Sequence, residues 1–436
     1  MRVIGLDVHR SFAVAAAVED ATVRQLGRIE LTREKVLTFA RQHLRSEDEV
    51  VLEATGNTFA IAKLLTPLVK RVVIANPLLV RAIAHAKVKT DKIDAAVLAK
   101  LHAAGFLPQV WQPDEATARL RRQVAQRFAI VQQMTRLKNR VHSTLHANLI
   151  PVRDGKLFSA RGRAWLAEQA LAPDERIAVD RTLAELDRLA TDLERIDALL
   201  AEATLPDRRV RRLMTVAGIN LTIAIGLVAA VGDVSRFASP AKLVSYFGLN
   251  PRVRQSGDRP AYHGRISKQG RAQARGLLVE AAWSAASSPG PLRAFFLRIK
   301  DRRGQQVAAV ATARKIAVLV WHLLTEQEDY AWARPALLAM KMRQAELKAG
   351  RASRRGGNKP GPARDYSIKA LREQERAWVE QAEKAYARFV EAWSERPKPG
   401  GARAPQPRRD AAGGAAGLSS SRPALRRAVA RGREGE

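Results

Sequence analysis

The sequence predicts an α/β N-terminal domain, a long helical hairpin, a mainly helical C-terminal domain and a basic tail. Three short apolar runs open the chain and give way to alternating helix and strand patterns. Farther along, apolar residues recur every three or four positions, as they do on amphipathic helices. At 436 residues the chain is long enough for two or three domains with separate cores. We expect these parts to span residues 1–108, 109–204, 205–330 and 331–436.

The first part reads as a mixed sheet flanked by helices. Residues 2–8 and 11–18 are apolar runs typical of buried strands, and residues 22–31 resemble a half-exposed strand. Further strands are predicted at Val50–Glu53 and Arg71–Ala75, with helices before and after each of them. Three strands followed by helix–strand alternation indicate a layered α/β fold. This order fits a ribonuclease-H-like fold, although periodicity alone equally permits other α/β folds.

The second part carries two long amphipathic helical patterns. Apolar residues recur at steps of three or four from Leu120 to Leu149 and again from Leu183 to Leu200. A break that contains Pro151 separates the two patterns. They predict a helical hairpin with coiled-coil-like seams. A rigid spacer and a dimerisation element are both compatible with this pattern.

The third part begins near Arg208 with a helix, a tight turn at Ala217–Gly218 and a second helix. This arrangement resembles a helix-hairpin-helix, whose backbone N–H groups and helix N-terminus can bind a phosphate. Gly218 is therefore a candidate nucleic-acid contact, although a glycine between two apolar helices often serves only as a turn. A basic loop and a helical run to about Leu324 follow.

The composition after residue 330 indicates a largely disordered tail. Arg, Pro, Gly, Ala and Ser dominate most of this stretch. One charged helix with several aromatic residues is possible at residues 365–395. Such a tail typically adds nonspecific, salt-sensitive attraction to nucleic acid.

The chain is strongly basic, with a formal net charge of +32 and a pI near 11.2. Expected partners are therefore DNA, RNA or acidic membranes. Residues 205–330 carry 20 basic and 8 acidic side chains, so much of the positive charge lies downstream of the α/β domain. The absence of cysteine excludes disulfides and thiolate metal sites. No run approaches about 18 consecutive apolar residues and no signal peptide opens the chain, which predicts a soluble cytoplasmic protein.

Four carboxylates are the candidate catalytic and metal-binding residues: Asp7, Glu53, Asp91 and Asp94. The first two end predicted strands, where an unpaired buried carboxylate would cost several kcal/mol, about 2–7 for a polar group alone. The other two lie three residues apart and share one face if they are helical, although Asp91 also suits a helix cap. Carboxylate oxygens are the ligands that Mg²⁺ prefers. Divalent ions at such a site promote phosphodiester cleavage or transfer, so we expect Mg²⁺, with Mn²⁺ as an alternative.

The motifs resemble those of the DEDD transposases of bacterial insertion sequences. GLDVH, LEATGN and KTDKIDA occur in order, followed by LMTVAGI, RFASPAKLVSYFGLNPRVRQSG and GRISKQGRAQARGLLVEAAW, over roughly residues 1–325. The resemblance implies a RuvC-like N-terminal domain related to Holliday-junction resolvases. It further implies homodimers that join into a tetramer on DNA, in a bacterial, nucleoid-associated setting. It also implies a structured noncoding guide RNA, which pairs with donor and target DNA.

The same resemblance places a nucleophilic serine at Ser256, in the motif RQSGD. A serine ester to DNA conserves the phosphodiester energy, so that strands can be rejoined without ATP. A free hydroxyl is a weak nucleophile and needs a metal or a base beside it. Ser-Gly-Asp is also a common β-turn. Rival hydroxyls are Ser245, Tyr246 and Ser267, and His263 is a possible base.

Basic residues near these groups are candidate nucleic-acid contacts. Around the serine they are positioned to hold a phosphate and its developing charge, and they comprise Arg252, Arg254, Arg259, Arg265 and Lys268. Near the second pair of acids they comprise Lys87 and Lys89, for which ordinary surface charge is an equal explanation.

Two other functions remain open on the sequence. The first is a junction-resolving nuclease that uses metal-activated water and does not need Ser256. The second is a non-enzymatic nucleic-acid-binding protein, which the charge alone permits. Since the acids and the serine belong to different predicted domains, active sites assembled between subunits are a further hypothesis.

Overall fold

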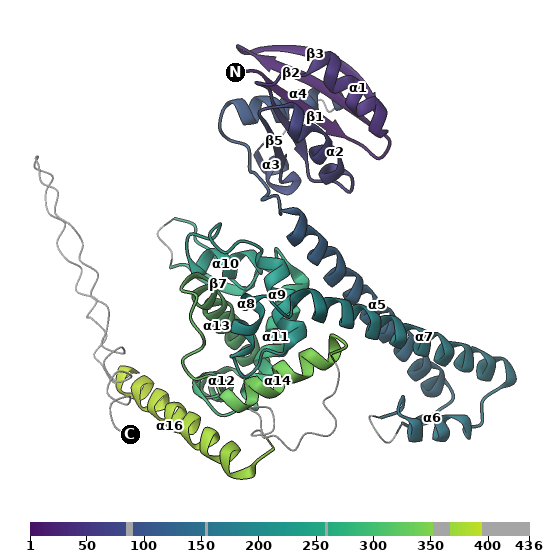
Figure 1. Cartoon of the computed structure of the whole chain (residues 1–436), viewed down its shortest axis with the longest axis vertical. Coiled ribbons are helices and arrows are strands. Elements are labelled where there is room, and N and C mark those ends of the chain that lie inside the picture. Colours follow the sequence, from purple (N-terminus) through teal and green to yellow (C-terminus); the bar gives the residue numbers. More distant parts are fainter. Residues whose placement is uncertain (84–89, 153–155, 258–259, 352–366, 395–436) are drawn as a thin grey trace, which may run out of the picture. The chain divides into compact units, whose positions relative to one another are not determined.

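The computed structural model shows an α/β domain, a long helical hairpin and a helical domain (Figure 1). Two compact units divide the chain, Met1–Tyr386 and Ala387–Glu436. Three candidate contacts, Lys87, Lys89 and Arg259, lie outside the residues that the structure describes. The described residues are 1–83, 90–152, 156–257, 260–351 and 367–394.

Five strands form one mixed sheet in the α/β domain, in the order β3-β2-β1-β4-β5. β2 is antiparallel to its neighbours β1 and β3, whereas β4 is parallel to β1 and to β5. All five strand predictions are confirmed to within about one residue at either end. This order is consistent with the expected ribonuclease-H-like, RuvC-like fold. The strands are β1 (Val3–Val8), β2 (Phe12–Glu19), β3 (Thr22–Glu30), β4 (Glu49–Glu53) and β5 (Arg71–Ala75).

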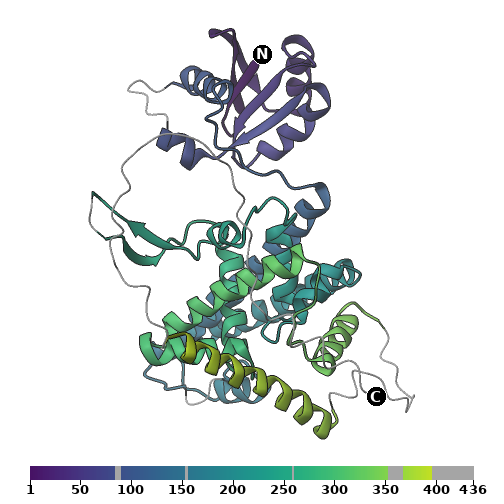
Figure 2. The same ribbon diagram turned by 90° about the vertical axis from the view of Figure 1, so that its left-hand side faces the viewer.

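Helices cover both faces of this sheet (Figure 2). On one face, α1 and α2 pack against Ile4, Leu6 and Val8 of the central strand β1. On the other face, α3 and α4 pack in a cluster that contains Val3. Because side chains alternate along a strand, the odd-numbered residues of β1 face α4. The helices are α1 (Arg33–His43), α2 (Thr58–Leu65), η1 (Thr66–Leu68), α3 (Pro77–Ile83) and α4 (Asp91–Ala103).

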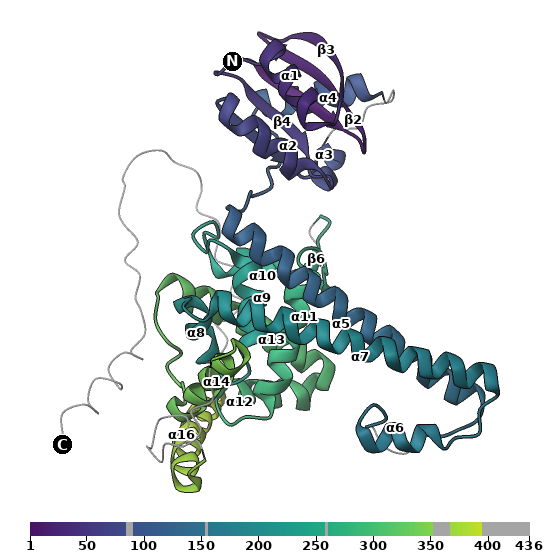
Figure 3. The ribbon, with the colours of Figure 1, turned by 45° about the vertical axis from the view of Figure 1, so that its right-hand side comes forward.

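The predicted helical hairpin is confirmed by two long helices, α5 (Glu115–Ala147) and α7 (Pro173–Thr204), which pair along their length (Figure 3). Leu137 of α5 packs against Leu186 and Leu189 of α7. The connection contains a short helix, α6 (Ala160–Ala167), that the sequence did not predict. Eight residues are too few for a helical repeat to be visible in the sequence.

The helical domain surrounds a core built mainly from α9, α11 and α13. A two-stranded antiparallel sheet, β6–β7, is its only strand pair among the described residues. Its elements are α8 (Arg208–Met214), α9 (Leu221–Val231), α10 (Pro240–Tyr246), β6 (Pro251–Arg254), β7 (Tyr262–Ile266), α11 (Ala272–Ala286), α12 (Pro291–Arg303) and α13 (Gln305–Thr325).

The described part of the C-terminal region contains two helices, whereas the disorder predicted for the rest falls on residues 352–366 and 395–436, which lie outside the described residues. The predicted helix at residues 365–395 corresponds to α16 (Lys369–Ser394). A further helix, α14 (Pro335–Lys348), was missed, and two of its alanines, Ala336 and Ala345, are buried. The sequence gives little sign of α14 because the apolar face of this helix is short and interrupted by charged residues. Tertiary contacts stabilise the helix.

Helix α13 is long and apolar enough to cross a membrane by length and composition, although Arg314 and Lys315 interrupt its apolar run. Half of its most apolar window is buried inside the protein, where Ile316, Ala317 and Val320 join the core of the helical domain. The core helix of a soluble protein passes the same test.

Candidate active site

Asp7 and Glu53 lie side by side at the carboxyl ends of two parallel strands. Leu6 of β1 is paired with Leu52 of β4, and the same register one residue farther aligns Asp7 with Glu53. Both residues are half-buried. Asp7 follows Val3 and Gly5 on the face that α4 covers, because every second side chain points to the same side.

Helix α4 packs directly on strand β1 because Gly5 has no side chain. A Cβ at Gly5 would lie 1.9 Å from the carbonyl oxygen of Ala95. This contact places the first turn of α4 beside the end of β1. Thr90, and not Asp91, caps the helix, and its Oγ1 accepts a hydrogen bond from the backbone N–H of Ile93 (3.4 Å). Asp91 and Asp94 thus occupy the first turn, where the helix dipole favours negative charge.

Asp7, Asp91 and His9 form a compact cluster, in which one ligand atom from each lies within 4.8 Å of the others. Nε2 of His9 lies 3.3 Å from Oδ2 of Asp7 and 3.4 Å from Oδ2 of Asp91. Burial raises the pKa of Asp7, and the charges of Asp94 and Asp91 raise it further, although His9 opposes them. The protein thus gathers acids whose mutual repulsion a cation would relieve.

The cluster fits a divalent cation by its donor chemistry. Half-buried carboxylates supply the oxygen ligands that Mg²⁺ and Mn²⁺ accept, and imidazole also binds transition ions such as Mn²⁺. Nε2 of His9 is buried and makes no well-aligned hydrogen bond within the described residues. His9 was missed as a site residue, although its position two residues after Asp7 in GLDVH was a usable signal.

The loop after β4 fixes the ends of both strands. Oγ1 of Thr58 donates to the carbonyl oxygen of Glu53 (2.6 Å) and accepts from the backbone N–H of Thr55 (2.7 Å). Nδ2 of Asn57 donates to the carbonyl oxygen of His9 (3.1 Å). The polar residues that follow Glu53 in LEATGNT therefore position the acidic cluster through the backbone.

Ser256 lies exposed in the connection between β6 and β7, in a different domain from the acids. The next residue, Gly257, has φ +59°, a left-handed conformation that suits the turn. Beside this connection the two strands form an open groove of about 380 Å³ with a basic lining. The groove is lined by Arg252, Arg254, Tyr262, Gly264, Arg265, Ile266 and Lys268.

The rival hydroxyls differ in their surroundings. Tyr246 is half-buried, and its hydroxyl accepts from Nε of Arg271 (2.8 Å) and donates to the carbonyl oxygen of Ala230 (3.2 Å). Burial alone would raise the pKa of Tyr246, but Arg271 and two further arginines outweigh it and lower the pKa. Ser245 is exposed on α10, and Ser267 follows β7. Of His263, only the backbone pairing with Val253 is described.

Gly218 is buried between α8 and α9. A Cβ there would lie 2.2 Å from the carbonyl oxygen of Ala281 on α11. Close helix packing therefore explains this glycine, and its contact with nucleic acid stays a prediction.

Two family models match the chain, one on each side of the helical hairpin. The N-terminal model, described as a transposase of the DEDD IS110 group, matches residues 4–149. The second, described as the transposase IS116/IS110/IS902 family, matches residues 210–297. The first covers the four acids and the second covers Ser256.

Relatives with transposase or related names match much of the chain. A probable family 20 transposase of Pseudomonas aeruginosa is 28% identical over 75% of this chain and 98% of its own length. The transposase for insertion sequence element IS1111A of Coxiella burnetii is 27% identical over 56% of this chain and 68% of its own length. A pilin gene-inverting protein of Moraxella bovis is 25% identical over 75% of this chain and 97% of its own length.

An α/β domain with clustered acids, joined to a transposase-type helical domain, defines the class as a transposase or DNA recombinase. Within that class, the chain matches the IS110 family of DEDD transposases over residues 4–149 and 210–297.

Proposed function

We propose that this protein catalyses Mg²⁺-dependent cleavage and exchange of DNA strands for an insertion sequence. The observation that carries the proposal is the alignment of Asp7 with Glu53 beneath the first turn of α4, which adds Asp91 and Asp94. These residues would hold the cation, which when bound stabilises the charge that develops on the phosphate oxygens. The acids would position the cation at the carboxyl ends of β1 and β4.

Ser256 is the proposed nucleophile. Its Oγ would bond to phosphorus and lose its proton, while the bond from phosphorus to the leaving sugar oxygen breaks and that oxygen is protonated. The reverse reaction, with a sugar hydroxyl from another strand, would rejoin DNA and free the serine. Exposure of Ser256 and the adjacent basic groove support this role, since Arg252, Arg254 and Lys268 can bind the phosphates beside the reacting one.

The family resemblance and the positive charge support a proposal for the remaining partners. We propose that the protein acts in the bacterial cytoplasm on element ends and target DNA, as a homodimer that assembles into a tetramer. A structured guide RNA is proposed to select the sites, and the formal net charge of +32 favours both nucleic acids. The long hairpin of α5 and α7 is the proposed dimerisation element.

The deciding experiment supplies the protein with Mg²⁺, labelled element-end DNA and the transcript of the flanking DNA. Denaturing gels detect covalent protein–DNA adducts, and sequencing detects recombined junctions. We expect adducts that disappear with Ser256→Ala and remain with the matched control Ser245→Ala. Asp7→Asn should abolish both adducts and junctions.

The alternatives give different results in the same assay. A nuclease that uses water predicts nicked products without adducts and an active Ser256→Ala protein. A binding protein predicts no product at all and DNA binding that is unchanged in Asp7→Asn. Mixing Asp7→Asn with Ser256→Ala tests whether chains share active sites, because only shared sites restore activity.

Inversion of a DNA segment is a second candidate outcome. The Moraxella bovis relative, matched over 97% of its length, carries the name pilin gene-inverting protein. A substrate with two element ends in opposite orientation distinguishes inversion from release of a circle.

A further inference from the structure

A buried lysine forms hydrogen bonds with the backbone of the turn between α8 and α9. Lys341, on α14, is only 8% exposed, and its Nζ donates hydrogen bonds to backbone carbonyl oxygens of that turn. We call these oxygens the carbonyl cage. They belong to Met214 (2.9 Å), Val216 (3.0 Å), Ala217 (3.4 Å) and Ile219 (2.8 Å).

The carbonyl cage has the character of a cation site. An ammonium group has three N–H donors, so the four oxygens surround the charge and do not each receive a separate hydrogen bond. Met214 ends α8, where carbonyl groups lack partners within the helix and the helix dipole favours positive charge. The side chains of Met214, Val216 and Ile219 are buried in the core, so the surroundings offer little other solvation. Rings of backbone carbonyls bind dehydrated monovalent ions in the same manner.

Lys341 is charged under ordinary conditions. Burial, together with the nearby Arg334, lowers the pKa of Lys341 to about 8. The ammonium form therefore prevails at neutral pH.

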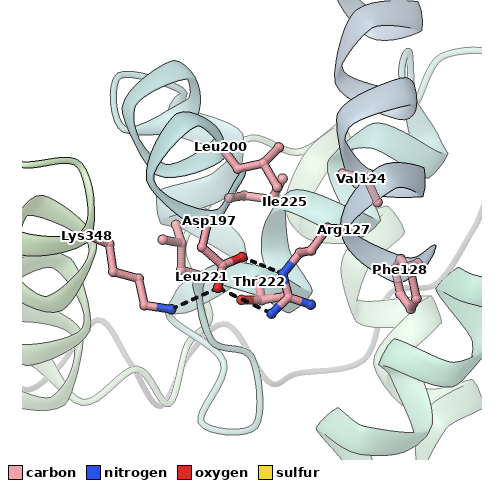
Figure 4. A pocket seen from close by; sticks show the side chains of 9 residues that line it. All are labelled: Val124, Arg127, Phe128, Asp197, Leu200, Leu221, Thr222, Ile225 and Lys348. Atoms are coloured by element: carbon pink, nitrogen blue, oxygen red, sulfur yellow. Dashed lines mark hydrogen bonds and ion pairs between the residues drawn. The ribbon is translucent and has the colours of Figure 1, made fainter. Parts of the chain in front are cut away.

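Helix α14 is held in place by contacts at both ends. At its start, Glu375 of α16 accepts a hydrogen bond from the backbone N–H of Ala336 (2.7 Å). At its end, Nζ of Lys348 lies 3.5 Å from Oδ2 of Asp197, which also pairs with Arg127 across the α5–α7 hairpin (Figure 4). These contacts fix Lys341 between them.

We propose that the α8–α9 turn is a binding site for a small monovalent cation, and that Lys341 is its built-in occupant. The carbonyl cage lies inside the segment matched by the transposase family model, which ends at residue 297, whereas Lys341 lies beyond it. Lys341 is thus a positioning residue that keeps the shape of the turn. K⁺ or NH₄⁺ occupies the carbonyl cage when the lysine side chain is shortened.

Thermal unfolding of the full chain in different salts tests this proposal. The variants are Lys341→Ala, which leaves room for an ion, and Lys341→Met, which removes the charge but fills most of the space. We expect Lys341→Ala to lose about 5–10 °C in choline chloride, and KCl or NH₄Cl at equal ionic strength to restore at least about half of that loss. Lys341→Met should show a similar loss and no recovery.

A matched control and a second readout separate this inference from the proposed function. Lys348→Ala, on the same helix, should show no difference between choline and potassium beyond that of the wild type. The inference uses the proposed function only in the second readout, where binding of Lys341→Ala to duplex DNA should become K⁺-dependent. Recovery of the unfolding midpoint without recovered DNA binding would uphold the cation site and count against the turn as a DNA contact.

Two outcomes overturn the inference. In the first, Lys341→Ala is as stable as the wild type in choline chloride, so the carbonyl cage needs no cation. In the second, Lys341→Ala is destabilised equally in choline, potassium and ammonium salts, including failure to fold in all three. The lysine would then act through packing alone.

Discussion

Gly5 lies so close to Ala95 that a Cβ on Gly5 would come within 1.9 Å of the Ala95 carbonyl oxygen. This contact joins the central strand to helix α4, and the first turn of that helix carries two of the four acids. The geometry of the proposed metal site therefore depends on a residue that binds no metal.

Replacing Gly5 with alanine should weaken both the fold and the metal site. Because the clash is with backbone, α4 has to shift, at an expected cost of about 1–3 kcal/mol in the free energy of unfolding. Displacement of Asp91 and Asp94 should also weaken Mg²⁺ binding, measured by calorimetry. Gly56→Ala is the control, since nothing lies within 4 Å of a Cβ there. Equal Mg²⁺ affinity in both variants would show that α4 does not depend on this contact.

Asp7→Asn should stabilise the metal-free protein and abolish its response to Mg²⁺. Burial and the neighbouring acids raise the pKa of Asp7 above the ordinary 3.8, so the folded state binds more protons than the unfolded state between those two pKa values. The contribution of Asp7 to the free energy of unfolding therefore falls as pH rises through that window. At neutral pH the ionised Asp7 destabilises the metal-free protein to the full extent. The unfolding midpoint of Asp7→Asn in EDTA should exceed that of the wild type at pH 7 and approach it below pH 3.8.

The activity of Asp7→Asn should move in the opposite direction. Loss of one metal ligand should lower strand cleavage by about 100-fold or more, which corresponds to about 3 kcal/mol of transition-state stabilisation. Mg²⁺ should raise the wild-type unfolding midpoint and leave that of Asp7→Asn unchanged. A metal-free Asp7→Asn protein that is less stable than the wild type would mean that the carboxylate supports the fold without a cation.

The sequence predicts much of the sheet and of the acidic site. Apolar runs mark β1, β2, β4 and β5 because these strands are buried, and Asp7 and Glu53 interrupt the runs of β1 and β4 at the strand ends. Two acids three residues apart imply one helix face without knowledge of the tertiary fold. The proposed meeting of Ser256 with the acids would require the proposed assembly on DNA, which no local pattern encodes.

Other features depend on tertiary contacts that local patterns do not reveal. His9 joins the site only because β1 and α4 converge, and Lys341 resembles any other lysine in a charged helix. Gly218 reads as a turn residue in sequence, yet its close contact with Ala281 becomes visible only once α11 is in place. Helix α14 was missed for the same reason, because contacts with the rest of the domain stabilise its short apolar face.

His9→Ala should shift the acid limb of the pH–activity profile to higher pH. The adjacent imidazole of His9 lowers the pKa of the Asp7 carboxyl, chiefly through its charge, so removing His9 raises that pKa further. Asp7 would then need a higher pH to ionise and bind a cation. The measurement is the rate of strand cleavage against pH at fixed Mg²⁺, with His146→Ala on α5 as the control. An acid limb at the same pH in both variants would argue against coupling between His9 and Asp7.

Two carboxylates of α16 should stabilise the helical domain by capping helices that lack caps of their own. Glu383 accepts hydrogen bonds from the backbone N–H of Gly290 (2.9 Å) and from Nε of Arg293 (2.9 Å), at the start of α12. Glu375 has the equivalent role at the start of α14. Neither α12 nor α14 has a side-chain cap within its own segment.

Glu375→Gln and Glu383→Gln should therefore each lower the free energy of unfolding by about 1–3 kcal/mol, measured in urea. Glu373→Gln is the matched control, because Glu373 lies on the same helix and is exposed beside Lys369. Its effect should stay within about 0.5 kcal/mol. If all three variants unfold at the same urea concentration, α16 does not cap these helices. Glu375→Gln should also loosen α14, so it should reproduce part of the destabilisation expected for Lys341→Met.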